Sequence, residues 1–172
     1  SLIRLIDDMF DVSRIRNGKL SIRPSGTDLA QLVGNVVESF AAQMEACGCE
    51  LRPERNEPII GVWDAFRIEQ VLANLLTNAM RYGAGKPVHV SVVSCADGAC
   101  IEVCDHGIGI SPQSLERIFC QFERAEGSES SAGLGLGLFI ADQIVRAHNG
   151  RIQVQSEEGQ GSLFRVLLPL GE

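Results

Sequence analysis

Apolar residues recur every three or four positions in four stretches of the chain, the spacing that gathers side chains on one face of an α-helix. The stretches cover residues 1–17 and about 28–47, 65–82 and 136–147. The apolar face of the first stretch consists of Leu2, Leu5, Ile6, Met9, Val12 and Ile15. The pattern therefore predicts four helices, each with one face suited to packing.

Polar residues and glycines mark where these helices begin and end. Thr27 or Asp28 stands where it can cap the second helix, and Asp64 where it can cap the third. Asn17-Gly18 and Asn149-Gly150 follow the first and the last helix. Both dipeptides are typical of helix ends, because Asn and Gly tolerate the left-handed conformation found there.

Short runs rich in β-branched and apolar residues fall between the helices and predict a sheet. The expected strands are residues 49–54, 59–63, 88–94, 100–104, 151–156 and 162–168. Ala96-Asp97-Gly98 predicts a hairpin between two of them, and Pro112 opens a short helix expected to end near Phe119. Helices interspersed with strands predict an α/β (α+β) protein, a two-layer α/β sandwich in which helices pack on a mixed sheet.

Three parts of the chain are expected. Residues 1–18 form a helix that opens the sequence without a cap, which predicts a piece of a longer protein. Residues 19–27 read as an extended connector, and residues 28–172 as one domain. Within this domain, residues 123–133 are small, polar and charged, and predict a mobile loop.

Charge and hydropathy exclude several classes of function. The net charge is −7, whereas a nucleic-acid-binding protein usually carries a basic face. Lysine occurs only at Lys19 and Lys86, so we expect no polybasic contact with a membrane. No apolar run approaches the roughly 18 residues of a membrane span, and no signal-peptide pattern opens the chain.

The cysteines form neither a Cys-x-x-Cys pair nor a set at zinc-ligand spacing. They stand at Cys47, Cys49, Cys95, Cys100, Cys104 and Cys120. We expect buried free thiols in an intracellular protein, with a disulfide or a metal site as the alternatives.

Glycine is concentrated in residues 105–109, 133–138 and 159–161. The second cluster opens a predicted helix, where backbone N–H groups and the helix dipole favour a phosphate; the alternative is an ordinary turn. The familiar nucleotide signatures are absent, because Pro87 follows Gly85-Lys86 and Leu138 replaces the last glycine of a dinucleotide fingerprint.

Asn74 and Asn78 are one turn apart on the third predicted helix. Asparagine is a poor helix former, so two on one face call for a reason. Either they are surface or satisfied core amides, or their carbonyl oxygens serve a hard cation such as Mg²⁺, which binds oxygen ligands together with substrate phosphates.

Five strings in order resemble the N, G1, F, G2 and G3 boxes of the catalytic ATP-binding domain of bacterial sensor histidine kinases. They are Asn74-Leu75-Leu76-Thr77-Asn78-Ala79, Asp105-x-Gly107-x-Gly109, Ile118-Phe119-x-x-Phe122, Gly133-x-Gly135-x-Gly137 and Gly159-x-Gly161-Ser162-x-Phe164. The resemblance covers residues 28–169 and implies the Bergerat-type fold, a mainly antiparallel mixed sheet covered by helices on one face. Residues 1–18 resemble the end of the second dimerisation helix of these kinases.

The resemblance implies a role for each motif. Asp105 would accept a hydrogen bond from the adenine amino group, and Asn78 would ligate Mg²⁺. Asn74 and Arg124 would act on the phosphate side as the catalytic residues, and residues 110–132 would form a lid over ATP. The implied nucleotide-binding residues are Asn74, Asn78, Arg81, Tyr82, Asp105, Gly107, Gly109, Ile110, Phe122, Gly133, Leu134, Gly135, Leu136, Gly137, Leu138 and Ser162.

Two positions depart from the family pattern. His106 stands where Asn is usual, and we expect it to face solvent; Ser162 replaces the common Thr. Neither change removes an implied ligand.

The wider superfamily also contains gyrase B, the 90-kDa heat-shock chaperone and MutL. Its ATP-driven clamps use a Glu one turn before the metal-binding Asn as general base, and Asn74 cannot take a proton there. The pair therefore favours a histidine kinase, with a clamp or a non-catalytic nucleotide sensor or docking domain as the alternative.

The kinase interpretation implies partners outside this sequence. None of His89, His106 and His148 begins an acceptor-type helix, so we expect the phosphoacceptor on a dimerisation domain of the longer, homodimeric protein. A response-regulator receiver domain would take the phosphoryl group onward. We expect a cytoplasmic location with no nucleic-acid or membrane contact by this part, and the longer protein either free or anchored in the inner membrane.

Overall fold

The structure is a computed structural model that describes residues 2–18, 20–120 and 136–171. Its helices are α1 (Leu2–Arg16), α2 (Leu29–Ala46), α3 (Ala65–Tyr82), α4 (Pro112–Leu115) and α5 (Gly137–Ala147). Its strands are β1 (Ser25–Asp28), β2 (Leu51–Asn56), β3 (Ile60–Trp63), β4 (Val88–Cys95), β5 (Gly98–Asp105), β6 (Arg151–Glu157) and β7 (Gly161–Leu168).

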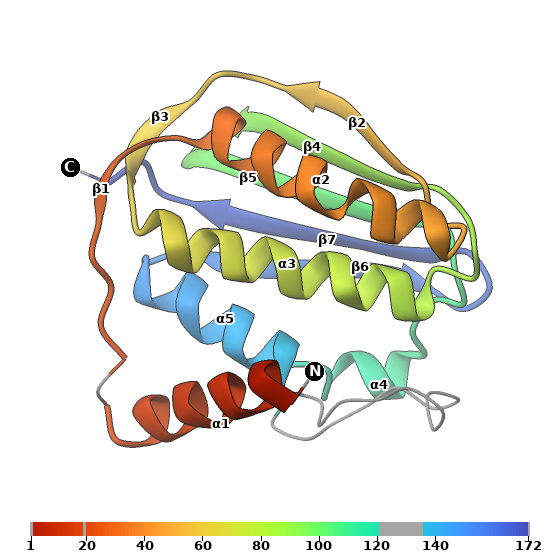
Figure 1. Ribbon diagram of the computed structural model, residues 1–172, viewed down its shortest axis with the longest axis horizontal. Helices are drawn as coiled ribbons and strands as arrows, with labels where there is room; N and C mark the ends of the chain where they lie inside the picture. The colour runs from red at the N-terminus through yellow and green to blue at the C-terminus, as the bar shows by residue number, and fades with distance from the viewer. Residues whose placement is uncertain (1, 19, 121–135, 172) are drawn as a thin grey trace.

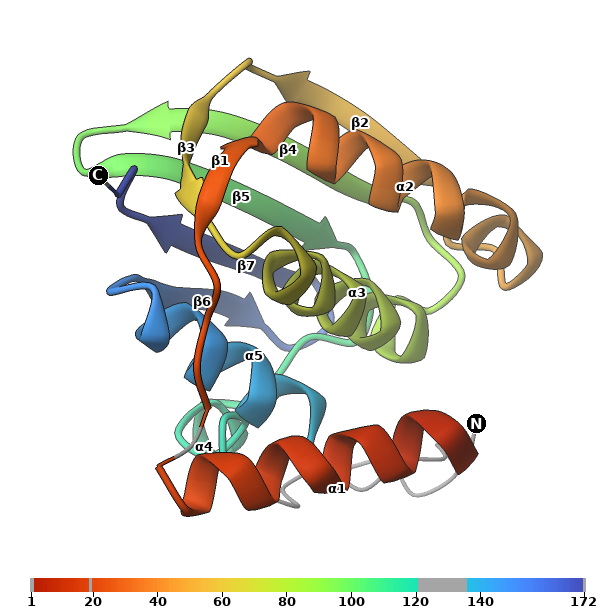
Figure 2. The ribbon, with the colours of Figure 1, turned by 60° about the vertical axis from the view of Figure 1, so that its left-hand side comes forward.

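A five-stranded sheet in the order β2-β4-β5-β7-β6 forms one layer. Only the β2–β4 pair is parallel; the other three pairs are antiparallel. Helices α2, α3 and α5 cover one face of this sheet, as both ribbon views show (Figure 1, Figure 2). The prediction of a two-layer sandwich with a mainly antiparallel mixed sheet is therefore confirmed.

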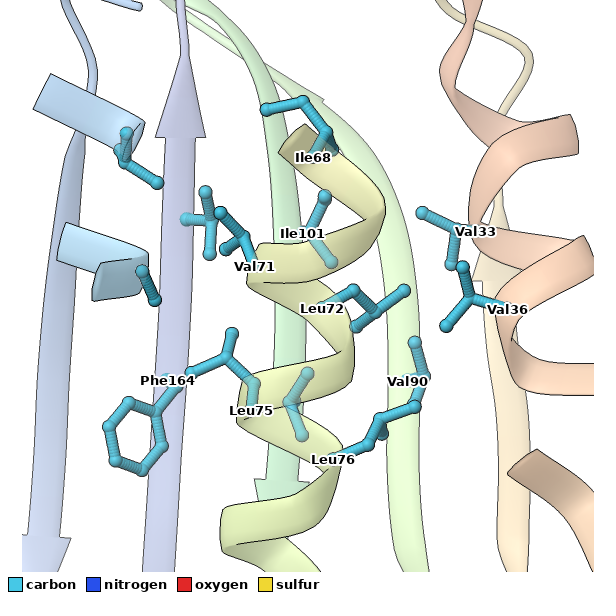
Figure 3. Packing of buried hydrophobic residues seen from close by; sticks show 14 of the residues in the cluster. Val33, Val36, Ile68, Val71, Leu72, Leu75, Leu76, Val90, Ile101 and Phe164 are labelled. Carbon is cyan, nitrogen blue, oxygen red and sulfur yellow. The ribbon is translucent and has the colours of Figure 1, made fainter. Parts of the chain in front are cut away.

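The core lies between α3 and the sheet, with α2 and α5 on either side of α3 (Figure 1). The apolar residues of α3 recur at helical spacing and meet alternating residues of the strands, so both periodicities of the sequence converge on one layer. Figure 3 shows this packing for Val33, Val36, Ile68, Val71, Leu72, Leu75, Leu76, Val90, Ile101 and Phe164, all of them buried.

The two main helices begin at the predicted caps. The Asp28 side chain accepts a hydrogen bond from the Gln31 N–H (3.2 Å), and the Asp64 side chain accepts one from the Arg67 N–H (3.2 Å). Each bond satisfies a backbone donor that has no partner within its helix. Asn149 adopts φ +62° just beyond α5, as expected at a helix end.

Two local predictions were wrong. Residues 25–28, expected within the connector, form β1, which pairs antiparallel with β3 in a separate two-stranded sheet. This strand has no alternating apolar pattern that would predict it. Its formation depends on pairing with β3, more than thirty residues away in the sequence. Helix α4 ends at Leu115 rather than near Phe119; beyond it, N–H groups bond to carbonyls three residues back, which tightens the chain into turns.

All six cysteines are free thiols, but not all are buried as predicted. Cys49 and Cys100 are buried and Cys95 and Cys104 half-buried, whereas Cys47 and Cys120 are exposed. Burial raises the pKa of Cys49, Cys100 and Cys104, which keeps these thiols protonated and unreactive. Within the described ranges, no three His, Cys, Asp or Glu side chains are arranged to hold a metal ion, and no helix has the length and apolar character of a membrane span.

Helix α1 packs near α5 (Figure 2). Its docked side carries Val12, which is buried, and Asp11, which is paired with Arg67 of α3. Other apolar residues of α1 are exposed: Leu2, Ile3, Ile6, Met9 and Phe10. The helix therefore attaches to the rest of the chain through one short stretch.

Candidate functional site

Asn74 lies on the face of α3 that meets α5. It is 5 % exposed, and its side-chain Nδ2 donates a hydrogen bond to the Gly137 carbonyl oxygen (3.1 Å). Gly137 is the first residue of α5, and a Cβ there would lie 3.7–3.9 Å from the Asn74 side chain. Asn74 is therefore a satisfied core amide that holds the start of α5 against α3. Asn78, half-buried, follows one turn later.

Asp105 ends β5 with its carboxylate almost fully buried, at 3 % exposure. Its Oδ1 accepts a hydrogen bond from the Gly107 N–H (3.0 Å), and the Ser162 backbone N–H provides a second bond. Burial raises the pKa of Asp105, opposed by these two N–H groups and by the nearby His106. A buried carboxylate fixed by backbone donors is a rigid acceptor for a donor group of a ligand.

The segment after Asp105 passes between the end of α3 and the turn from β6 to β7. The Ile108 N–H donates to the Tyr82 carbonyl oxygen (3.1 Å), and the Ile108 carbonyl accepts from the Gly159 N–H (2.8 Å). A Cβ on Gly107 would lie 1.8 Å from the Tyr82 carbonyl oxygen, so only glycine fits there. Gly109 has φ +72°, and a Cβ there would lie 2.1 Å from the Glu157 carbonyl oxygen.

Ser156 fixes the same segment from the β6 side, and the sequence reasoning missed it. Its Oγ accepts a hydrogen bond from the Ile110 N–H (2.8 Å) and donates one to the Gly161 carbonyl oxygen (2.9 Å). It also lies 2.8 Å from the Ser162 Oγ. The one available signal was the pairing of two strand-end serines across the Gly159-x-Gly161 turn.

The remaining implied residues fall into two groups. Arg81 is exposed, Tyr82, Gly109 and Leu138 are half-buried, and Ile110 and Leu136 are buried. The residues that lie outside the described ranges are Phe122, Arg124, Gly133, Leu134 and Gly135. The same holds for most of the expected lid and for the predicted loop at 123–133.

His106 is exposed, as predicted, but it is not isolated. Its ring meets the His89 ring edge-on, with centroids 5.2 Å apart and an interplanar angle of 84°. The side chain therefore lies on the side of β5 away from the Asp105 carboxylate, because neighbouring residues of an extended chain point in opposite directions.

Contacts thus join four of the five motifs in two pairs. Asp105-Gly109 contacts the end of α3, Ser162 is paired with Asp105, and Asn74 touches the start of α5. Among the described residues no side chain caps α5, which leaves its N-terminal dipole for an anion. The site combines a buried acceptor, amide oxygens suited to a hard cation, and a helix start suited to phosphate.

Comparison with known proteins agrees with this geometry. Residues 63–172 match the family model described as histidine kinase-, DNA gyrase B- and HSP90-like ATPase. The sensor histidine kinase MtrB of Mycobacterium leprae is 34 % identical over 169 residues, which cover 96 % of this chain and 30 % of MtrB. The alginate biosynthesis sensor protein KinB of Pseudomonas aeruginosa is 33 % identical over 171 residues, 98 % of this chain and 28 % of KinB.

Solved structures show the same fold. The Acinetobacter baumannii histidine kinase AdeS superposes with a TM-score of 0.80 at 25 % identity, over 98 % of this chain and 78 % of AdeS. Full-length ShkA in complex with AMPPNP gives a TM-score of 0.86 at 26 % identity, over 98 % of this chain and 35 % of ShkA. The chain spans less than a third of the length of MtrB and KinB.

Proposed function

The chain belongs to the family of histidine kinase-, DNA gyrase B- and HSP90-like ATPases, and from this premise we propose that it is the ATP-binding half of a sensor histidine kinase. It binds Mg·ATP and presents the γ-phosphate to a histidine on a dimerisation domain. Residues 1–18 are the end of the second helix of that domain, residues 19–27 the connector, and residues 28–172 the catalytic domain.

The observation that carries this proposal is the buried Asp105 carboxylate, followed by a segment that bonds to the C-terminal end of α3, the helix of Asn74 and Asn78. Its two backbone donors hold the carboxylate as an acceptor, which suits the exocyclic amino group of adenine. The 6-oxo group of guanine is itself an acceptor and would face Asp105 without a hydrogen between them. Adenine nucleotides are therefore preferred.

The phosphate side is formed by α3 and the start of α5. The Asn78 amide oxygen suits Mg²⁺, a hard cation that usually combines a few protein oxygens with substrate phosphates. When bound, the ion neutralises phosphate charge. Asn74 keeps the first residue of α5, Gly137, against α3. Arg124 is assigned to the terminal phosphate by the family motif alone.

The phosphoacceptor lies on another domain, because the histidines of this chain are unsuited to the role. His148 is 7 % exposed and has both ring nitrogens engaged, Nε2 with the Asp64 N–H (3.0 Å) and Nδ1 with the Ile144 carbonyl oxygen (2.9 Å). His89 lies in β4, and His106 directly follows the adenine acceptor. The expected partners are the dimerisation domain of a homodimeric parent and a response-regulator receiver domain.

An ATP-driven clamp is the weaker candidate. Such a machine needs a general base one turn before the metal-binding Asn, and that position holds Asn74. The Asn74 amide is buried and bonded to Gly137, so no carboxylate occupies the place from which a water would be activated. We place the catalytic half in the cytoplasm, with the longer protein either free or anchored in the inner membrane.

Calorimetric titration with Mg·ATP tests the proposal. We expect a Kd between about 1 μM and 1 mM. Asp105→Ala should weaken binding about ten- to a hundredfold, the effect of losing a charge-assisted hydrogen bond. Asp97→Ala, in the exposed β4–β5 turn, is the matched control and should bind like the wild type. No binding by the folded wild type would overturn the proposal.

Phosphotransfer is tested by adding the dimerisation domain of the same parent protein. Incubation with γ-labelled ATP should then label that domain at histidine, giving a bond that is labile in acid and stable in base. ATP binding without any such label would contradict the kinase function and indicate a nucleotide sensor.

A further inference from the structure

Three polar residues form a row across three neighbouring strands. Asp105 of β5 lies directly opposite Ser162 of β7, and Ser162 lies directly opposite Ser156 of β6. Directly opposed residues point to the same side of a sheet. Here this is the side that packs on the helices, because Val103, Phe164 and Val154, two positions away on the same strands, belong to or pack against the core. The row therefore begins at the proposed adenine acceptor and ends at the sheet edge.

The hydrogen bonds of Ser156 determine where the hydrogens of this row lie. A hydroxyl has one hydrogen to donate and two lone pairs to accept with. The Ser156 hydrogen goes to the Gly161 carbonyl oxygen (2.9 Å), because a carbonyl can only accept. One lone pair accepts the Ile110 N–H (2.8 Å), since that N–H can only donate.

This leaves one lone pair on Ser156 for its third partner, the Ser162 Oγ at 2.8 Å. Ser162 must therefore be the donor of that bond, and its only hydroxyl hydrogen is directed at Ser156. The Ser162 hydroxyl can therefore only accept hydrogen bonds from any other group, including a bound ligand. Asp105 lies directly opposite Ser162 in the strand register. The Asp105 carboxylate and the Ser162 oxygen are therefore two neighbouring hydrogen-bond acceptors, and neither can donate a hydrogen.

We propose that Ser156 is a positioning residue that makes this site reject 6-oxo purines by fixing the Ser162 hydroxyl as an acceptor. The inference rests on the proposed adenine-nucleotide function and adds to it a residue outside the sequence motifs. A free Ser162 hydroxyl would be able to rotate and donate to a purine O6, which would rescue part of the binding of inosine or guanine nucleotides. The bond to Ser156 removes that option.

The test is the ratio of the Kd values of ITP and ATP, measured by titration calorimetry with Mg²⁺ present. ITP carries the 6-oxo group without the 2-amino group of GTP, so it differs from ATP only at purine position 6 and at the neighbouring N1, which carries a hydrogen in ITP. Ser156→Ala should lower the ratio of the ITP Kd to the ATP Kd about fivefold or more, the usual effect of one gained hydrogen bond. Ser156→Thr retains a hydroxyl and should keep the wild-type ratio.

A double variant distinguishes the release of the Ser162 hydroxyl from a general loosening of the segment that Ser156 holds. Ser156→Ala together with Ser162→Ala has no hydroxyl to donate, so the gain in ITP binding should disappear. A purely structural role of Ser156, through its bond to Ile110, would weaken ATP and ITP equally. Thermal melting of each variant establishes that it is folded.

The outcomes are distinct. An unchanged ratio in folded Ser156→Ala, or an ITP gain that persists in the double variant, overturns the role of Ser156 while leaving the ATP site intact. A wild-type protein that binds neither ATP nor ITP overturns the proposed function itself, and the role of Ser156 with it.

Discussion

The Arg67 guanidinium of α3 lies 3.1 Å from the Asp11 carboxylate of α1, and each side chain is about one-tenth exposed. Gln70 completes the group: its Nε2 donates to Asp11 (2.8 Å), and its Oε1 accepts from Arg67 (2.9 Å). Arg67, Gln70 and Asn74 follow one another at helical spacing on α3. The attachment of α1 and the support of the nucleotide site thus share one face of one helix.

Replacing Asp11 with Ala should release α1. Removal of one partner leaves Arg67 as a buried charge without its counterion, which typically costs about 3–5 kcal/mol. Few other contacts hold α1, since among its described side chains only Val12 is a buried apolar residue, with Ile15 packed against the core at its edge. Hydrogen exchange should then show loss of amide protection along α1 with the sheet amides still protected.

Asp7→Ala is the matched control for this experiment. Asp7 lies one turn before Asp11 on the same helix but is exposed. Its replacement should leave α1 protected. Equal protection of α1 in the Asp11 variant and in the control would contradict the structural role assigned to the ion pair.

Asn74→Ala should destabilise the domain and weaken nucleotide binding together. The variant removes the Nδ2 donor to the Gly137 carbonyl, and the loss of one such hydrogen bond costs about 0.5–1.5 kcal/mol. The midpoint of urea unfolding should fall with an unchanged m-value. If stability is unchanged while ATP binding is lost, Asn74 acts on the ligand and not through α5.

Asn78→Ala should make the affinity for ATP independent of Mg²⁺. The half-buried amide is the assigned metal ligand, so the variant should bind ATP with the same affinity in excess Mg²⁺ and in EDTA. The wild type should bind more tightly with Mg²⁺ than without it. A variant that retains the wild-type response to Mg²⁺ would remove Asn78 from the metal site.

The helices of this fold could be predicted from the sequence because each carries its own signals. The α3 boundaries follow from Asp64 as cap and a sustained apolar repeat, both local to the segment. Strand β1 could not be found in that way, since its existence depends on β3. The apolar spacing of Leu115, Ile118 and Phe119 predicted a longer α4, but the chain beyond Leu115 forms tighter turns with bonds three residues back.

The candidate site was predictable as a set of residues but not as a set of bonds. The motifs indicated Asp105, Asn74 and Ser162, and the structure brings their elements together. The bond from Asn74 to Gly137 and the bond from Ile110 to Ser156 depend on distances between elements far apart in the sequence. Sequence spacing carries no information on such distances.

The buried Asp105 carboxylate predicts a specific pH dependence of stability. Its pKa is raised by burial, so between the ordinary and the raised pKa the native state binds more protons than the unfolded chain. The free energy of unfolding therefore loses a contribution as the pH rises through this window. Asp105→Asn, which stays neutral, should remove that loss and be at least as stable as the wild type at pH 7.

The measurement is urea unfolding across the acidic range, taken as the difference between the wild type and Asp105→Asn. The difference cancels groups with the opposite sign, such as Glu57, whose pKa is lowered by its hydrogen bonds to Ser94. Asp97→Asn serves as the exposed control. A constant difference at all pH values would show that Asp105 does not titrate differently in the folded state.

Gly107→Ala should disrupt the segment that follows Asp105. The added Cβ would lie 1.8 Å from the Tyr82 carbonyl oxygen and 2.6 Å from the Gly83 Cα, both backbone atoms that no side-chain rotation can move aside. Overpacking of this kind costs about 1–3 kcal/mol or more, so the melting temperature should fall and ATP affinity should be lost. Gly26→Ala, where a Cβ meets nothing within 4 Å, should leave both unchanged. Wild-type melting and affinity in Gly107→Ala would mean that α3 and this segment are not in direct contact in solution.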